Sequence, residues 1–156
     1  LNHAFMKACL FLIAGGIRYQ TALWEIPRFA GLGRRMPWTM AAFTVAALSM
    51  VGIPPTAGFF SKWYLILGGI DAGNWIFVVI ILVSSLLSAV YFFRVLENAY
   101  TASANSEGPV AASSDPPCGM LLPILVLAAG ILILGLLNVV IVKRVLELVV
   151  APLHGG

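Results

Sequence analysis

The chain divides into long apolar stretches separated by short polar connectors. Uncharged runs cover residues 36–61, 75–93 and 120–142. An α-helix needs about 20 apolar residues to cross a bilayer, and these runs are close to that length or longer. The pattern therefore predicts an all-α, integral membrane helical bundle with about four transmembrane segments. We place these segments at about 1–17, 37–70, 75–100 and 119–149.

The second of these segments is too long for one plain helix, and it contains paired prolines. It stays apolar over about 37–70. Pro54 and Pro55 lack backbone N–H groups and disfavour helical backbone at the residue before each. We expect a helix over about 37–50, a non-helical break, and a second helix over about 56–70. Within a membrane, the carbonyls freed by such a break need water or polar neighbours.

The composition supports a membrane location. Hydrophobic residues make up 61% of the 156 residues and charged residues 10%, whereas a soluble domain is usually about 45–50% apolar and about 25% charged. The net charge of +3 does not indicate nucleic-acid binding, because the basic residues lie near the ends of apolar segments and form no stripe on a soluble module.

The basic residues predict an orientation in the membrane. Four of them lie between the first two segments, and they are Arg18, Arg28, Arg34 and Arg35. Because successive helices alternate in direction, Arg94 and the connector after the third segment share this side, whereas Lys143 and Arg144 lie on the other. Lys and Arg accumulate on the cytoplasmic side of membrane proteins, so we expect the first connector to be cytoplasmic.

Two lysines inside the apolar segments are candidates for proton transfer. Lys7 has His3 four residues before it, a spacing that places both on one helix face, and histidine titrates near neutral pH. Lys62 follows the predicted break, and broken helices in membranes usually line polar cavities. The alternative for each lysine is that its side chain extends to the membrane surface and merely anchors the helix.

No sequence motif indicates a cofactor, a metal ion or a catalytic site. Cys9 and Cys118 belong to no CxxC pattern, and the sequence has no P-loop, no GxGxxG after a strand and no HExxH. We expect two unpaired thiols. The sequence begins at Leu1 within an apolar segment and shows no signal-peptide pattern. We interpret it as the C-terminal part of a longer membrane domain.

Three blocks of sequence resemble the antiporter-like membrane subunits of complex I (NADH:quinone oxidoreductase), membrane-bound hydrogenases and Mrp-type sodium/proton antiporters. The blocks are His3 to Leu12, Gly31-Leu32 with Met36-Pro37, and Gly52 to Lys62. The resemblance implies a fold of about fourteen transmembrane helices in two inverted repeats, each with a broken helix, of which this chain is similar to the last four.

The resemblance also implies roles for particular residues. His3 and Lys7 match the histidine and lysine of the family's proton path in the eleventh helix. Pro54 and Pro55 match the break in the twelfth helix. Lys62 matches the ionisable residue after that break, near the half-channel that opens outward, where some members carry Glu.

The implied function is that of a proton-translocating subunit, the terminal half-channel of a multi-subunit Mrp-type cation/proton antiporter or related complex. Two alternatives stay open: an antiporter-like subunit of complex I, or a truncated segment that does not conduct. The implied partners are the lipid bilayer, other membrane subunits, protons and possible coupling sodium ions. The implied location is the inner membrane of a bacterial cell. Any enzyme activity would belong to an NADH:quinone oxidoreductase translocase of which the chain is one part.

Overall fold

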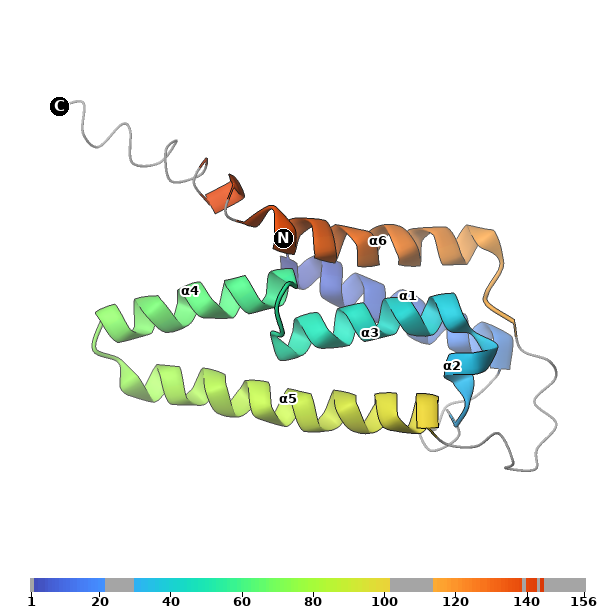
Figure 1. The fold of residues 1–156 in the computed structure, drawn as a ribbon, viewed down its shortest axis with the longest axis horizontal. Coiled ribbons are helices and arrows are strands. Elements are labelled where there is room, and N and C mark those ends of the chain that lie inside the picture. Colours follow the sequence, from blue (N-terminus) through green and yellow to red (C-terminus); the bar gives the residue numbers. More distant parts are fainter. Residues whose placement is uncertain (1, 22–29, 102–113, 139, 143, 145–156) are drawn as a thin grey trace.

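The computed structural model describes residues 2–21, 30–101, 114–138, 140–142 and 144, and all the elements found in them are helices (Figure 1). They are α1 (Asn2–Thr21), α2 (Leu32–Arg35), α3 (Pro37–Val51), α4 (Ala57–Asp71), α5 (Trp75–Thr101) and α6 (Cys118–Leu136). The predicted all-α class is confirmed. Arg28 and Lys143, which contributed to the predicted orientation, lie outside the described residues.

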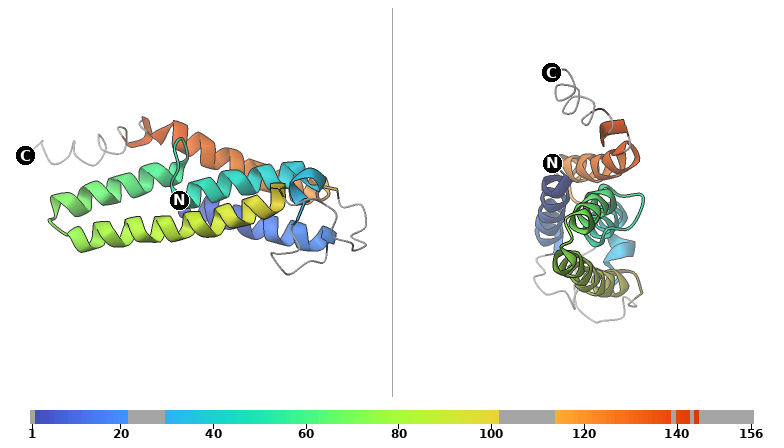
Figure 2. Two further views of the ribbon diagram at one scale, coloured as in Figure 1. Left: turned by 60° about the horizontal axis from the view of Figure 1, so that its bottom comes forward. Right: turned by 90° about the vertical axis from the view of Figure 1, so that its left-hand side faces the viewer.

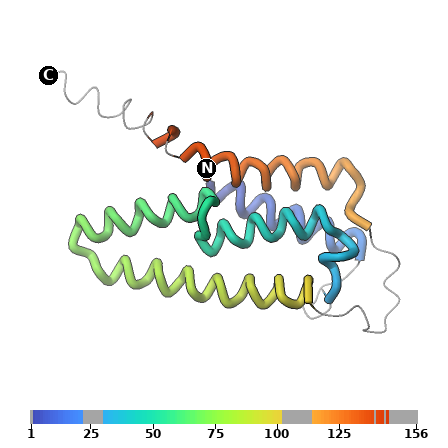
Figure 3. Tube along the Cα trace, viewed as in Figure 1, coloured from blue at the N-terminus to red at the C-terminus, as the bar shows by residue number. Residues whose placement is uncertain are grey.

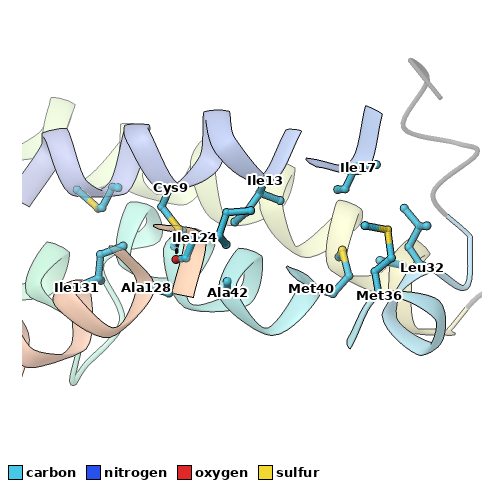
Figure 4. Packing of buried hydrophobic residues seen from close by; sticks show 13 residues of the cluster. Cys9, Ile13, Ile17, Leu32, Met36, Met40, Ala42, Ile124, Ala128 and Ile131 are labelled. Carbon is cyan, nitrogen blue, oxygen red and sulfur yellow. Dashed lines mark hydrogen bonds between the residues drawn. The ribbon is translucent and has the colours of Figure 1, made fainter. Parts of the chain in front are cut away.

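The core lies where α1, α3 and α6 pack together. Each of these helices contributes small or branched side chains that are almost fully buried, among them Cys9, Ile13, Ala42, Ile124 and Ile131 (Figure 4). The Cys9 thiol donates to the carbonyl oxygen of Ile124 at 3.7 Å. Helices in lipid associate mainly through close packing, which small side chains permit. These three helices therefore form the core against which the other described helices pack.

The second predicted segment is broken, as the paired prolines indicate. Helix α3 ends at Val51 and α4 begins at Ala57, and the chain steps sideways between them (Figure 3). Gly52 follows α3 in the left-handed conformation, with φ of 91°, and its N–H donates to the carbonyl of Leu48. A glycine in this conformation is a common helix stop. The helix therefore ends before Pro54 is reached.

Helices α4 and α5 form an antiparallel hairpin that extends beyond the core (Figure 2). The tight turn between them contains Gly73, which has φ of 68°. Asn74 precedes α5, and its Oδ1 accepts a hydrogen bond from the N–H of Phe77 at 3.2 Å. Asparagine before a helix is a favoured N-cap because it satisfies a free backbone N–H.

Two of the described helices, α5 and α6, are long and apolar enough to cross a membrane, and α3 is a shorter apolar helix. Helix α5 buries few of its side chains, and large apolar residues such as Ile76, Leu86 and Val90 are well exposed on it. An apolar surface of this extent suits contact with lipid or with other membrane helices.

Helix termini gather at one end of the bundle, where α1 and α5 end, α6 begins and α2 lies (Figure 1). Asp115 holds this end together. Its carboxylate accepts from the N–H of Thr39 at 2.9 Å and from the Thr39 hydroxyl at 2.7 Å, and its backbone carbonyl accepts from Gln20 Nε2 at 2.9 Å. The described residues just before α6 are thereby tied to α1 and α3.

Candidate functional site

The ammonium group of Lys62 lies at the broken end of α3. Its Nζ donates to the carbonyl oxygens of Met50 at 2.8 Å and Val51 at 3.1 Å. It also donates to the hydroxyl oxygen of Ser85 on α5 at 2.8 Å. A protonated lysine has three N–H donors and no acceptor, so these three partners match its hydrogen-bonding capacity. Lys62 is thus one of the polar neighbours that the freed carbonyls of the break require.

The electrostatics of this position favour a cation. The last carbonyls of a helix have no partner within the helix and carry the negative end of its dipole. Helix α3 presents these carbonyls to Lys62 within the apolar part of the chain. A lysine at the centre of a membrane helix costs about 2.5–3.5 kcal/mol on insertion scales. Three hydrogen bonds and the helix dipole offset part of this cost.

Other backbone groups at the break are also paired. The N–H of Gly58, in the first turn of α4, donates to the hydroxyl oxygen of Ser49, and this serine is fully buried. The N–H groups of Gly52 and Ile53 both donate to the carbonyl of Leu48. Since a buried unpaired N–H group is costly, these bonds hold the break in one conformation.

Two glycines let neighbouring segments approach the break closely. A Cβ atom on Gly58 would overlap the carbonyl oxygen of Ser49, and a Cβ atom on Gly135 of α6 would overlap the carbonyl oxygen of Pro55. The peptide bond between Pro54 and Pro55 is cis. The backbone of α4 therefore packs directly against the end of α3, and that of the break against α6, while Pro54 and Pro55 are exposed.

His3 and Lys7 lie on a different surface. Both side chains are exposed, together with Phe11, on the face of α1 opposite to the one that packs on α3 and α6. The predicted sharing of one helix face by His3 and Lys7 agrees with this placement. No hydrogen bond among the described residues joins either of them to Lys62.

A polar contact connects the start of α1 with α4. Asn2 Nδ2 donates to the hydroxyl oxygen of Ser61 at 3.0 Å, and Ser61 in turn donates to the carbonyl of Ala57. Asn2 precedes His3 in sequence, and Ser61 precedes Lys62. The two groups of candidate residues thus lie on neighbouring helices, although their side chains do not meet.

Sequence reasoning missed Ser85 and Ser49 as parts of this site. The available signal was the presence of hydroxyl side chains inside apolar segments, where they need a hydrogen-bond partner. Hydropathy does not show which face of α5 or α3 turns toward Lys62. No cluster of three or more potential metal-ligating side chains occurs among the described residues.

Comparison with known proteins identifies the family. The model described as "NADH:quinone oxidoreductase/Mrp antiporter, TM" matches residues 1–88, which is more than half of the 156-residue chain. The chain belongs to this family. Together with its apolar helices, this membership makes it an integral membrane protein.

Named relatives include subunits of two kinds of complex. The chain is 50% identical, over 94% of its length, to an NADH-quinone oxidoreductase subunit of Desulforudis audaxviator. It is 33% identical, over 86% of its length, to a Na(+)/H(+) antiporter subunit of Alkalihalophilus pseudofirmus. It covers 31% of the first relative and 27% of the second, so it spans about a third of their length or less.

Solved structures with this fold include two membrane complexes. The Mrp complex from Dietzia sp. matches 90% of the chain with a TM-score of 0.80 at 23% identity, and the chain covers 34% of the matched chain. This match shows the fold alone. An archaeal membrane-bound sulfane sulfur reductase matches 86% of the chain with a TM-score of 0.72 at 32% identity, and 22% of its matched chain is covered. Relatives of this chain are thus parts of multi-subunit membrane complexes.

Proposed function

We propose that the chain forms a proton-conducting half-channel of an antiporter-like membrane subunit, in which Lys62 takes up and releases the proton. The observation that carries this proposal is the position of Lys62 Nζ, 2.8 Å from the Met50 carbonyl and 3.1 Å from the Val51 carbonyl at the broken end of α3. Ion-coupled transporters use the ends of broken helices at membrane depth to bind their coupling ions.

Lys7 and His3 are the second part of the proposed path. They share the exposed face of α1, and the contact between Asn2 and Ser61 places the start of that helix beside α4. An imidazole ring can both accept and donate a proton, which is what a relay beside a lysine requires. We assign both side chains to the route by which protons reach the break.

The complex that suits the chain best is a quinone-linked oxidoreductase. Its 50% identity is to a subunit of such a complex, against 33% to the antiporter subunit. In this proposal the redox chemistry takes place in other subunits, and the chain is a multi-pass part of the inner membrane of a bacterial cell. Its partners are the surrounding membrane subunits, lipid and protons.

A second candidate is a subunit of an Mrp-type cation/proton antiporter. It is favoured by the similarity to the Na(+)/H(+) antiporter subunit and by the agreement in fold with the Mrp complex. In that case an imposed sodium gradient would drive proton movement in vesicles without any electron donor. Proton movement that depends on an electron donor and quinone would support the first candidate instead.

The test compares Lys62→Leu with the unchanged complex in sealed inside-out vesicles. Proton uptake is followed by quenching of a pH-sensitive dye, and assembly is checked on native gels. We expect the variant to assemble and its uptake to fall by roughly tenfold or more, as for loss of a proton-transfer group. Trp63→Phe, which changes the exposed neighbour of Lys62, is the control and should pump normally. Normal uptake by assembled Lys62→Leu would contradict the proposal.

A further inference from the structure

Ser85 differs in kind from the other two partners of Lys62. The carbonyl oxygens of Met50 and Val51 can accept hydrogen bonds but cannot donate them. The Ser85 hydroxyl, which lies 2.8 Å from Lys62 Nζ, can do both. This difference is important only if the charge of Lys62 changes, which is what the proposed function requires.

The change of charge alters what the nitrogen can bind. A protonated lysine has three N–H donors, and each has an acceptor in Met50, Val51 or Ser85. A neutral amine keeps two N–H donors and gains a lone pair that can accept. Two carbonyls suit the two remaining donors. The lone pair then needs a donor, and rotation of the Ser85 hydroxyl supplies one without moving any backbone.

We propose that Ser85 is a positioning residue that stays hydrogen-bonded to Lys62 in both charge states, and this rests on the function proposed above. When Lys62 is deprotonated, one of its N–H bonds breaks and the proton passes to a water molecule. The electron pair left on Nζ then accepts from the Ser85 hydroxyl, whose own O–H bond stays intact. Uptake of a proton from water reverses both changes. The nitrogen is held at the end of α3 throughout.

Helices α1, α3, α5 and α6 all pack against α4. The described ionisable side chains on α4 and these neighbours, apart from Lys62 itself, are His3, Lys7, Cys9, Arg18, Tyr19, Tyr64, Asp71, Tyr91, Arg94, Glu97, Tyr100 and Cys118. None of them is a hydrogen-bond partner of Lys62 Nζ. The charged residues of α5 begin at Arg94, about 13 Å along the helix from Ser85. Ser85 is therefore the side chain best placed to influence the charge of Lys62.

The test measures proton uptake across a range of pH with the assembled complex in vesicles. Ser85→Ala removes an acceptor from the charged lysine and a donor from the neutral one. A hydrogen bond to a charged group is the stronger of the two, so the charged state loses more. We expect the alkaline limb of the pH profile to move to lower pH by roughly 0.5–1 unit.

Two matched variants separate this effect from a change in packing. Ser85→Thr keeps the hydroxyl, so its pH profile should match that of the unchanged complex. Ser84→Ala removes the adjacent hydroxyl, which lies on the exposed outer face of α5, and should leave the profile unchanged. If Ser85→Ala fails to assemble, Ser85→Cys carries the same expectation because a thiol forms weaker hydrogen bonds.

Lys62→Leu distinguishes failure of this inference from failure of the proposed function. If assembled Lys62→Leu pumps normally, Lys62 has no role in transport and both proposals are wrong. If Lys62→Leu abolishes uptake while Ser85→Ala keeps an unshifted pH profile, the positioning role of Ser85 is wrong and the function of Lys62 stands. Both proposals are supported if the pH profile shifts in Ser85→Ala and does not shift in Ser85→Thr.

Discussion

At the scale of single residues, the two candidate lysines have different surroundings. Lys62 is held by three hydrogen bonds at the break, whereas Lys7 is exposed on α1 beside His3. A lysine held by carbonyls has a defined position in which to gain or lose a proton. A lysine on an exposed apolar helix face needs a further polar partner if that face is covered in a complex.

Replacement of Lys7 tests whether the face of α1 belongs to the proton path. We expect Lys7→Ala to lower proton uptake in vesicles by roughly tenfold or more, because a proton-transfer group is lost. Lys7→Arg is the informative companion variant, since arginine keeps the charge but does not release a proton under these conditions. It should assemble and also fail to pump. Normal pumping by either variant would exclude a proton-transfer role for Lys7.

At the scale of elements, α3 has a charged group at each end. The Asp115 carboxylate accepts from backbone N–H groups at its start, and Lys62 donates to carbonyls at its end. Both charges have the sign that the helix dipole favours. Since α3 also packs against α1, α5 and α6, the position of Lys62 depends on how firmly this one helix is held.

Loss of the Asp115 carboxylate should loosen the start of α3. We expect Asp115→Ala to reduce stability by about 1–2 kcal/mol, as for loss of an N-cap, and to speed amide hydrogen exchange at Trp38 and Thr39. Hydrogen exchange followed by mass spectrometry measures this directly. Asp71→Ala, at the exposed end of α4, should leave exchange in α3 unchanged. Equal amide exchange rates at Trp38 and Thr39 in the two variants would show that their hydrogen bonds to Asp115 do not stabilise α3.

Close packing of α6 on the break gives a second test at this scale. A Cβ atom at Gly135 would overlap the Pro55 carbonyl oxygen, whereas one at Gly119, in the same helix, would meet nothing within 4 Å. We expect Gly135→Ala to lower stability by about 1–3 kcal/mol, as for overpacking of a core, and Gly119→Ala to have little effect. Thermal unfolding in detergent would compare them, and equal melting temperatures would mean that α6 does not contact the break as described.

The sequence predicted the helix break but not the partners that make it a site. Segment length and paired prolines are local signals, so the break near Pro54 could be expected. Met50 and Ser85 lie 12 and 23 residues from Lys62 in sequence and on other helices, so their contact with it depends on how α3, α4 and α5 are aligned. Hydropathy carries no information on that alignment. For the same reason, the sequence did not predict the contact between Asp115 and the start of α3.

At the scale of the whole molecule, the arrangement of helices makes the predicted orientation testable. The basic α2 and the start of α6 lie at the same end of the bundle (Figure 1). Cys118, at the start of α6, is exposed, and Cys9 is buried in the core. The native Cys118 thiol can therefore report which side of the membrane this end faces.

We expect Cys118 to be labelled by a membrane-impermeant maleimide in inside-out vesicles, because the basic end should be cytoplasmic. Cys118→Ser should abolish the labelling, since Cys9 is enclosed by α1, α3 and α6. Mass spectrometry of the labelled chain gives the result. Labelling in right-side-out vesicles, with none in inside-out ones, would reverse the orientation.

The central claim is that Lys62 changes its charge during transport, and proton uptake by Lys62→Arg tests it most directly. Arginine can still donate to the Met50 and Val51 carbonyls and keeps the positive charge at the end of α3, but it does not lose its proton at accessible pH. The account predicts that assembled Lys62→Arg complex does not pump protons at any pH tested. Pumping at the unchanged rate would contradict it, because a fixed charge at the break would then be sufficient.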